Sequence, residues 1–237
     1  MKLKDLKQHD ILFDHTDGNF LDDPMIFVCN AIQSITNSKW NHVKSVHQII
    51  EPTPDGIFIS EAAPSGYIKQ SLRDSTGKHD TTMVCRYCAD NVEGRELTPE
   101  QCQRLYEWDV KRLSEEIPYG FTQIAMLAIL KQMENDSVAG MFLGKTLEEA
   151  QQTIEEFGKQ YICSEAKYLL FAENGIDIGI LKDSSHLSHY ISKGNAFDRY
   201  KAGVDDLNPV IADWISPHDL FMARKIIRME KLEINWR

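Results

Sequence analysis

The sequence predicts an α+β protein, and two observations support this fold class. Short apolar or alternating segments near the N-terminus and at the C-terminus indicate strands. The middle of the chain, about 98–175, has apolar residues at helical spacing and two capping boxes. Strands and helices are therefore segregated along the chain and do not alternate regularly, which is typical of α+β proteins.

Five segments have the composition expected of strands: 11–13, 42–50, 57–61, 81–87 and 225–234. The sequence Pro-Thr-Pro-Asp-Gly at 52–56 is a turn signal between the second and third of these segments. We therefore expect these two segments to pair as a β-hairpin.

Start and stop signals predict six helices. Four of them cover 25–35, 121–133, 146 to about 158 (which opens with a capping box) and 164–173. The other two begin at the capping box 98–101 and at 216–219. The segment 184–214 has weak periodicity and many polar residues, so it is predicted to be a long irregular excursion. The whole chain, 1–237, is predicted to form a single domain.

Composition and charge limit the classes of molecule that we expect the protein to bind. The formal net charge is −10, and the basic residues form no stripe, so nucleic acid and anionic membrane surfaces are not expected as partners. The N-terminal lysines precede no apolar run, and no window has the ~18 apolar residues of a membrane span. Five cysteines without a secretion signal favour a reducing compartment, and we expect a cytoplasmic protein.

One cysteine lies where a reactive thiol would be expected. Cys163 falls in the segment 161–165, Tyr-Ile-Cys-Ser-Glu, where a new helix is predicted to begin. A helix N-terminus stabilises a thiolate through the macrodipole and the free backbone N–H groups. Because the thiolate is the nucleophile, Cys163 is a candidate nucleophile, and its own N–H is a candidate oxyanion donor.

A reactive thiol also needs a base, and the base needs a group that orients it. His42 and Glu61 lie on the two predicted strands of the hairpin, so their side chains can meet across the strands. A carboxylate beside an imidazole selects its tautomer and stabilises the imidazolium. We therefore predict His42 as general base and then acid, with Glu61 as the residue that orients it.

Six short segments occur in an order that resembles one known family. They are 9–13 (His-Asp-Ile-Leu-Phe), 40–43 (Trp-Asn-His-Val), 59–67 (Ile-Ser-Glu-Ala-Ala-Pro-Ser-Gly-Tyr), 118–121 (Pro-Tyr-Gly-Phe), 161–165 and 215–220 (Ile-Ser-Pro-His-Asp-Leu). Together they resemble the motifs of the circularly permuted papain-like, NlpC-type cysteine amidases, in their YiiX-like branch. The order of histidine, acid and then cysteine is the permuted order of that family.

The resemblance implies an antiparallel sheet, partly curled into a barrel, that packs against helices. It also implies hydrolysis of an amide bond in a small peptide-like or amino-acyl substrate through an acyl-enzyme, without a metal or organic cofactor. Tyr119 matches the family's fourth catalytic residue, and Tyr161 is a second candidate for that position. The same machinery would serve a thioesterase or an acyltransferase, since only the second nucleophile differs.

The chain departs from the family pattern at several places, and other interpretations stay open. Asn41 replaces a Ser or Thr, Tyr67 replaces a Val, and the usual Leu-Val after Cys-Ser-Glu is Ala-Lys at 166–167. A catalytically silent binding module would keep the same fold and pocket. Cys85 and Cys88 form a Cys-x-x-Cys pair, which His79 and Cys102 could complete as a zinc site.

Overall fold

The computed structural model describes residues 1–16, 33, 38–76, 80–121, 124, 160–180 and 215–234. Apart from residues 33, 121 and 124, the predicted helices at 25–35, 121–133 and 146–158 lie outside the described residues. The predicted excursion at 184–214 also lies outside them. The candidate catalytic residues, by contrast, are all among the residues that the structure describes.

Among the described residues, six strands form one antiparallel sheet, and five of them correspond to the predicted strand segments. In the sheet they lie in the order β4-β3-β2-β1-β5-β6. Their bounds are Ile11–Thr16 (β1), His42–Ile49 (β2), Ile57–Ala63 (β3), Gly66–Ser71 (β4), Asp80–Tyr87 (β5) and Ile226–Lys231 (β6). The sheet has two edges, β4 and β6, so within the described residues it is open and not closed into a barrel.

The predicted hairpin of β2 and β3 is present. Ser45 pairs with Ser60 and Ile49 pairs with Ile57, and the register shifts between Val46 and Gln48. Strand β4 continues the meander beyond β3 and was not predicted. It is an edge strand whose side chains are largely polar and partly exposed, so the alternation that marks a strand is weak there.

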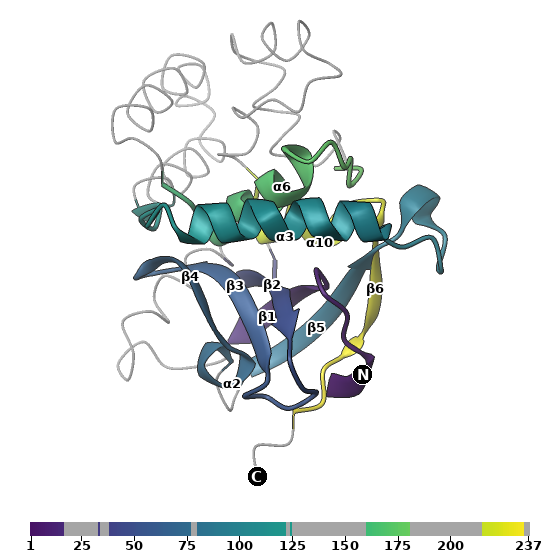
Figure 1. Cartoon of the computed structure of the whole chain (residues 1–237), viewed down its shortest axis with the longest axis horizontal. Helices are drawn as coiled ribbons and strands as arrows, with labels where there is room; N and C mark the ends of the chain where they lie inside the picture. Colours follow the sequence, from purple (N-terminus) through teal and green to yellow (C-terminus); the bar gives the residue numbers. More distant parts are fainter. Residues whose placement is uncertain are drawn as a thin grey trace, which may run out of the picture.

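Three helices lie together on one side of the sheet (Figure 1). They are α3 (Pro99–Leu113), α6 (Cys163–Ala172) and α10 (Pro217–Met222). A capping box begins α3 at Thr98, and another begins α10 at Ser216, as the sequence predicted. Shorter elements are α2 (Leu72–Ser75), η1 (Leu3–Asp5) and η2 (Ala89–Asn91).

Helix α6 is central because all ten of its residues are buried. It packs against β2 and β3 on one side and contacts α3 and α10. A helix that is buried on every face carries little amphipathic signal, and its position in a fold depends on its neighbours. The packing therefore holds Cys163, the first residue of α6, beside the two strands of the hairpin.

The sheet separates two apolar clusters, because successive side chains of a strand point to opposite faces. Ile11 and Phe13 of β1 belong to the larger cluster, which includes the residues of α6 and α10. Leu12 belongs to the smaller cluster, in which Leu6 and Leu72 also pack. The larger cluster thus lies on the same side of the sheet as the helix that begins at Cys163.

Candidate active site

Cys163 is the first residue of α6 and is 2% exposed. The N-cap residue is Ile162, which has no side-chain oxygen to accept from the first-turn N–H groups. Glu165 accepts a hydrogen bond from the Ile162 N–H at 3.2 Å, and the Ser164 hydroxyl donates to the Ile215 carbonyl at 2.6 Å. These bonds anchor the start of the helix on both sides of the thiol.

His42 lies at the start of β2 and contacts Glu61 of β3 through a short hydrogen bond between Nε2 and Oε2. Since Ser45 pairs with Ser60, Lys44 lies across from Glu61, so His42 and Glu61 are diagonal neighbours. Glu61 is 3% exposed and lies within β3, which continues to Ala63. The carboxylate is therefore held inside the sheet and does not lie at a free strand end.

Cys163 is the second partner that acts on this imidazole, through its effect on the pKa of His42. Burial alone would lower the pKa of His42, but hydrogen bonds to Cys163 and Glu61, and the negative charge on both partners, raise it to about 10. The surroundings of His42 therefore favour the imidazolium form.

Glu61 remains ionised although it is buried. Burial alone would raise its pKa, but the hydrogen bond and positive charge of His42, with the nearby charge of Lys44, lower it to about 2. Gln70 of β4 donates to the second carboxylate oxygen at 2.6 Å. Both oxygens of Glu61 therefore have partners, which restricts the orientation of the carboxylate toward His42.

Tyr119 lies beside the segment that leads into Cys163. Its backbone forms a β-bridge with Tyr161, and the Gly120 N–H donates to the Tyr161 carbonyl at 2.9 Å. The Tyr119 ring packs edge-on against Phe121, with ring centroids 4.8 Å apart. Backbone pairing thus places the turn at 118–121 next to the segment that precedes Cys163.

A second buried polar cluster lies on the elements that carry Cys163, His42 and Glu61. It was not predicted from the sequence as part of the site. Lys167, one turn after Cys163 on α6, is fully buried and donates to Ser45, Ser60 and Tyr67. The Tyr67 hydroxyl in turn donates to Asp109 of α3. The sequence contained two signals: Lys167 departs from the family pattern, and Asp109 is a charge on the apolar face of a helix.

The Cys-x-x-Cys pair has the surroundings of core residues. Cys85 is fully buried, and burial raises the pKa of its thiol to about 12. Cys88 is also buried, whereas Cys102 is partly exposed. His79 lies outside the described residues, and within them no three His, Cys, Asp or Glu side chains are grouped as a metal site.

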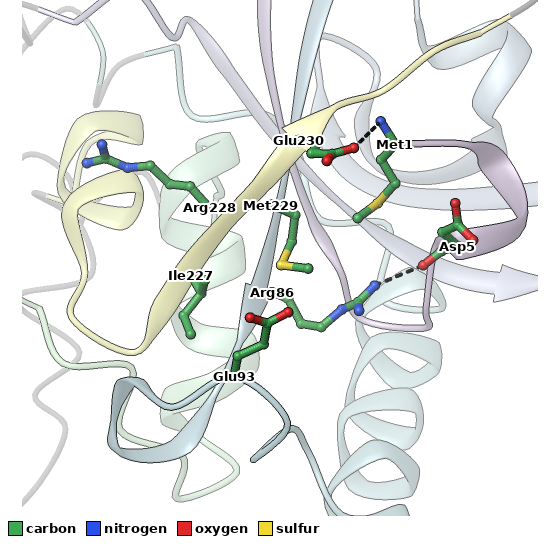
Figure 2. A pocket seen from close by; sticks show the side chains of 8 residues that line it. All are labelled: Met1, Asp5, Arg86, Glu93, Ile227, Arg228, Met229 and Glu230. Atoms are coloured by element: carbon green, nitrogen blue, oxygen red, sulfur yellow. Dashed lines mark hydrogen bonds and ion pairs between the residues drawn. The ribbon is translucent and has the colours of Figure 1, made fainter.

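A cavity of about 450 Å³ lies beside β6, between this strand and the N-terminal segment (Figure 2). Its lining does not include Cys163, His42 or Glu61. The Met1 ammonium pairs with Glu230 at 3.1 Å, and Arg86 donates to the Asp5 carbonyl at 3.0 Å. Because none of the three candidate catalytic side chains lines this cavity, we place the candidate site at Cys163 and not in it.

No family model matches the sequence, and no curated protein matches it. No helix among the described residues is both long and apolar enough to cross a bilayer. Function is therefore inferred from the geometry and chemistry of the site itself.

Proposed function

We propose that this chain is a cysteine hydrolase of the circularly permuted papain-like, NlpC-type fold and cleaves an amide bond in a small peptide-like or amino-acyl substrate. The observation that carries the proposal is that one imidazole, His42, is hydrogen-bonded to the carboxylate of Glu61 and has its pKa raised by Cys163. These three groups come from α6, β2 and β3. The permuted order of motifs in the sequence supports the same assignment.

The arrangement suits nucleophilic catalysis. His42 in its imidazolium form stabilises the Cys163 thiolate, which attacks the substrate carbonyl carbon and forms a carbon–sulfur bond. The oxyanion that develops is within the reach of the N–H groups at the start of α6, which Ile162 leaves without a side-chain acceptor. His42 then donates its proton to the leaving amine, and the carbon–nitrogen bond breaks to leave an acyl-enzyme.

Deacylation uses the same groups. Neutral His42 takes a proton from water, and the hydroxide attacks the acyl carbon. The carbon–sulfur bond breaks, the acid product leaves, and the thiolate and imidazolium are restored. Glu61 stabilises the imidazolium in both half-reactions and selects the tautomer in which Nε2 carries its proton.

The proposal is tested first by the reactivity of the thiol. Iodoacetamide labels thiolates, and peptide mapping by mass spectrometry separates Cys163 from Cys102. Cys102 is a suitable internal reference because it is partly exposed and burial raises the pKa of its thiol. We expect Cys163 to be labelled rapidly at pH 6 and Cys102 only at alkaline pH. Labelling of Cys163 that rises only near pH ~8.5, like a free thiol, would indicate a silent binding module.

Turnover provides the second test. A panel of fluorogenic amino-acyl and dipeptidyl amides, with matching thioesters, should include a substrate that forms a trapped acyl-enzyme in intact-mass spectra. Cys163→Ala and His42→Ala should each abolish its turnover with little change in Tm, whereas Cys102→Ala should retain it. Turnover of thioesters alone would assign the site to a thioesterase. Full activity in Cys163→Ala would show that the triad is wrongly assigned.

A further inference from the structure

A buried ammonium lies one helical turn behind the candidate nucleophile. Lys167 is 0% exposed, and its Nζ lies 2.9 Å from each of three oxygens: Ser45 Oγ, Ser60 Oγ and Tyr67 Oη. An ammonium has three N–H donors, so this set satisfies all of them. The geometry is therefore that of a charged lysine with complete hydrogen bonding.

The partners of Lys167 lie on the elements that carry the triad. Ser45 is three residues after His42 on β2, and Ser60 directly precedes Glu61 on β3. The two hydroxyls are also within hydrogen-bond distance of each other, at 3.1 Å. Lys167 thus links α6, which begins at Cys163, to both strands that carry the base and its orienting acid.

The negative charge nearest along this network is Asp109 of α3. Its Oδ1 accepts from Tyr67, and its Oδ2 lies 2.6 Å from Nδ1 of His47. Asp109 is fully buried, which disfavours its charged form. These bonds and the charge of Lys167 nevertheless stabilise the carboxylate. Moving an ammonium into a protein interior carries a desolvation penalty, and an apolar side chain would fill the same space without that penalty.

We propose that Lys167 is a positioning residue of the candidate active site: its ammonium joins the start of α6 to the strands of His42 and Glu61, and its charge favours the thiolate of Cys163. The proposal rests on the proposed function and deepens it. No covalent role for Lys167 is involved, because all three of its donors are engaged by protein oxygens.

The protonation of Lys167 is sensitive to its surroundings. Burial lowers the pKa of Lys167 to about 8, although the negative charges of Asp109, Glu61 and Cys163 act in the opposite direction. Tyr67 is a further titratable group that faces the ammonium, and burial holds its pKa well above its usual range. As the pH rises through about 8, Lys167 should lose its charge, and its support of the thiolate should weaken.

The test compares wild type with Lys167→Met and with the double variant Lys167→Met/Asp109→Asn. The double variant removes both buried charges, so we expect it to be more stable than Lys167→Met, in which Asp109 would be left without its opposite charge. The readout is the rate of Cys163 alkylation between pH 5 and 10. Unfolding temperature is measured in parallel, which separates loss of reactivity from loss of the fold.

In both variants we expect alkylation of Cys163 at pH 6 to slow by roughly tenfold or more, because removal of a neighbouring cation disfavours the thiolate by about this factor. A folded double variant with the wild-type profile would overturn the role of Lys167 while leaving the proposed function intact. A wild-type protein whose Cys163 behaves as an ordinary thiol would instead overturn the proposed function, and the role of Lys167 with it.

Discussion

His42 and Glu61 are diagonal neighbours on adjacent strands, and a hydrogen bond from Nε2 to Oε2 joins them in the interior of the sheet. Diagonal positions are farther apart than directly opposed ones, and both side chains are long enough to span the gap. The relationship between His42 and Glu61 therefore determines the orientation of the general base.

The raised pKa of His42 predicts a specific response to removal of the thiol. Hydrogen bonding to Cys163 and its negative charge both contribute to the value of about 10, so Cys163→Ala should lower the pKa of His42 by more than one unit. The measurement is an NMR pH titration of the histidine ring resonances. An unchanged His42 pKa in Cys163→Ala would show that imidazole and sulfur do not interact.

Replacing the carboxylate of Glu61 by an amide tests the effect of its charge separately from the effect of its shape. Glu61→Gln keeps the size of the side chain but removes the charge that stabilises the imidazolium, so we expect alkylation of Cys163 at pH 6 to slow by roughly tenfold or more. Glu51→Gln is the matched control, since Glu51 is exposed at the turn of the same hairpin. Equal alkylation rates in the two variants would contradict the orienting role of Glu61.

Two buried carboxylates predict how the free energy of unfolding changes at acid pH. The pKa values of Glu61 and Asp109 are both lowered to about 2 in the folded chain. Their contribution to the free energy of unfolding is therefore present above the ordinary carboxyl pKa of about 4 and is lost as the pH falls through about 2.

Urea unfolding between pH 2 and 6 measures this effect. The free energy of unfolding of wild type should change little between pH 6 and about 5 and should then decrease as the pH falls toward 2. In Asp109→Asn the overall stability should be lower, but the decrease with falling pH should be shallower, because one titrating group is gone. A slope in Asp109→Asn equal to that of wild type would exclude Asp109 from the linkage.

Gly66 is predicted to be required at the turn between β3 and β4. Its φ is +111°, and a Cβ at this position would lie 2.7 Å from the Ile117 carbonyl oxygen, which accepts from the Tyr67 N–H. Gly66→Ala should lower the free energy of unfolding by about 2 kcal/mol or more, because backbone strain and overlap combine.

Gly94→Ala is the matched comparison for Gly66→Ala. The φ of Gly94 is also positive, at +89°, but an added Cβ would meet no atom within 4 Å. The loss of stability in Gly94→Ala should therefore be smaller, at about 1 kcal/mol from backbone strain alone. Chemical denaturation of both variants checks the difference, and equal losses would show that the contact with Ile117 has no effect.

Much of the local structure could be predicted because its signals are local. The capping boxes at Thr98 and Ser216 begin α3 and α10, and the turn at 52–56 joins the two strands of the hairpin. The start of α6 at Cys163 was predicted to within one residue. Strand β4 was missed, because an edge strand with polar, partly exposed side chains lacks the alternation of a half-buried strand.

The network around Lys167 could not be predicted, because its parts are far apart in the sequence. Lys167 and Ser45 are separated by 122 positions, and Tyr67 and Asp109 by 42. A buried charge is stable only where hydrogen-bond partners and an opposite charge converge on it. No local pattern encodes such convergence, and a sequence shows only the individual polar residues in otherwise apolar surroundings.

By itself, the sequence determined the elements: alternation marks the strands of the hairpin, capping residues mark the ends of helices, and a cysteine is placed at a helix start. The tertiary structure alone decided which side chains meet. It sets the diagonal contact of His42 with Glu61, the approach of His42 to Cys163, and the closure of the Lys167 network. The physical reason is that short-range signals depend on backbone preferences, whereas a site depends on the packing of α6 against the sheet.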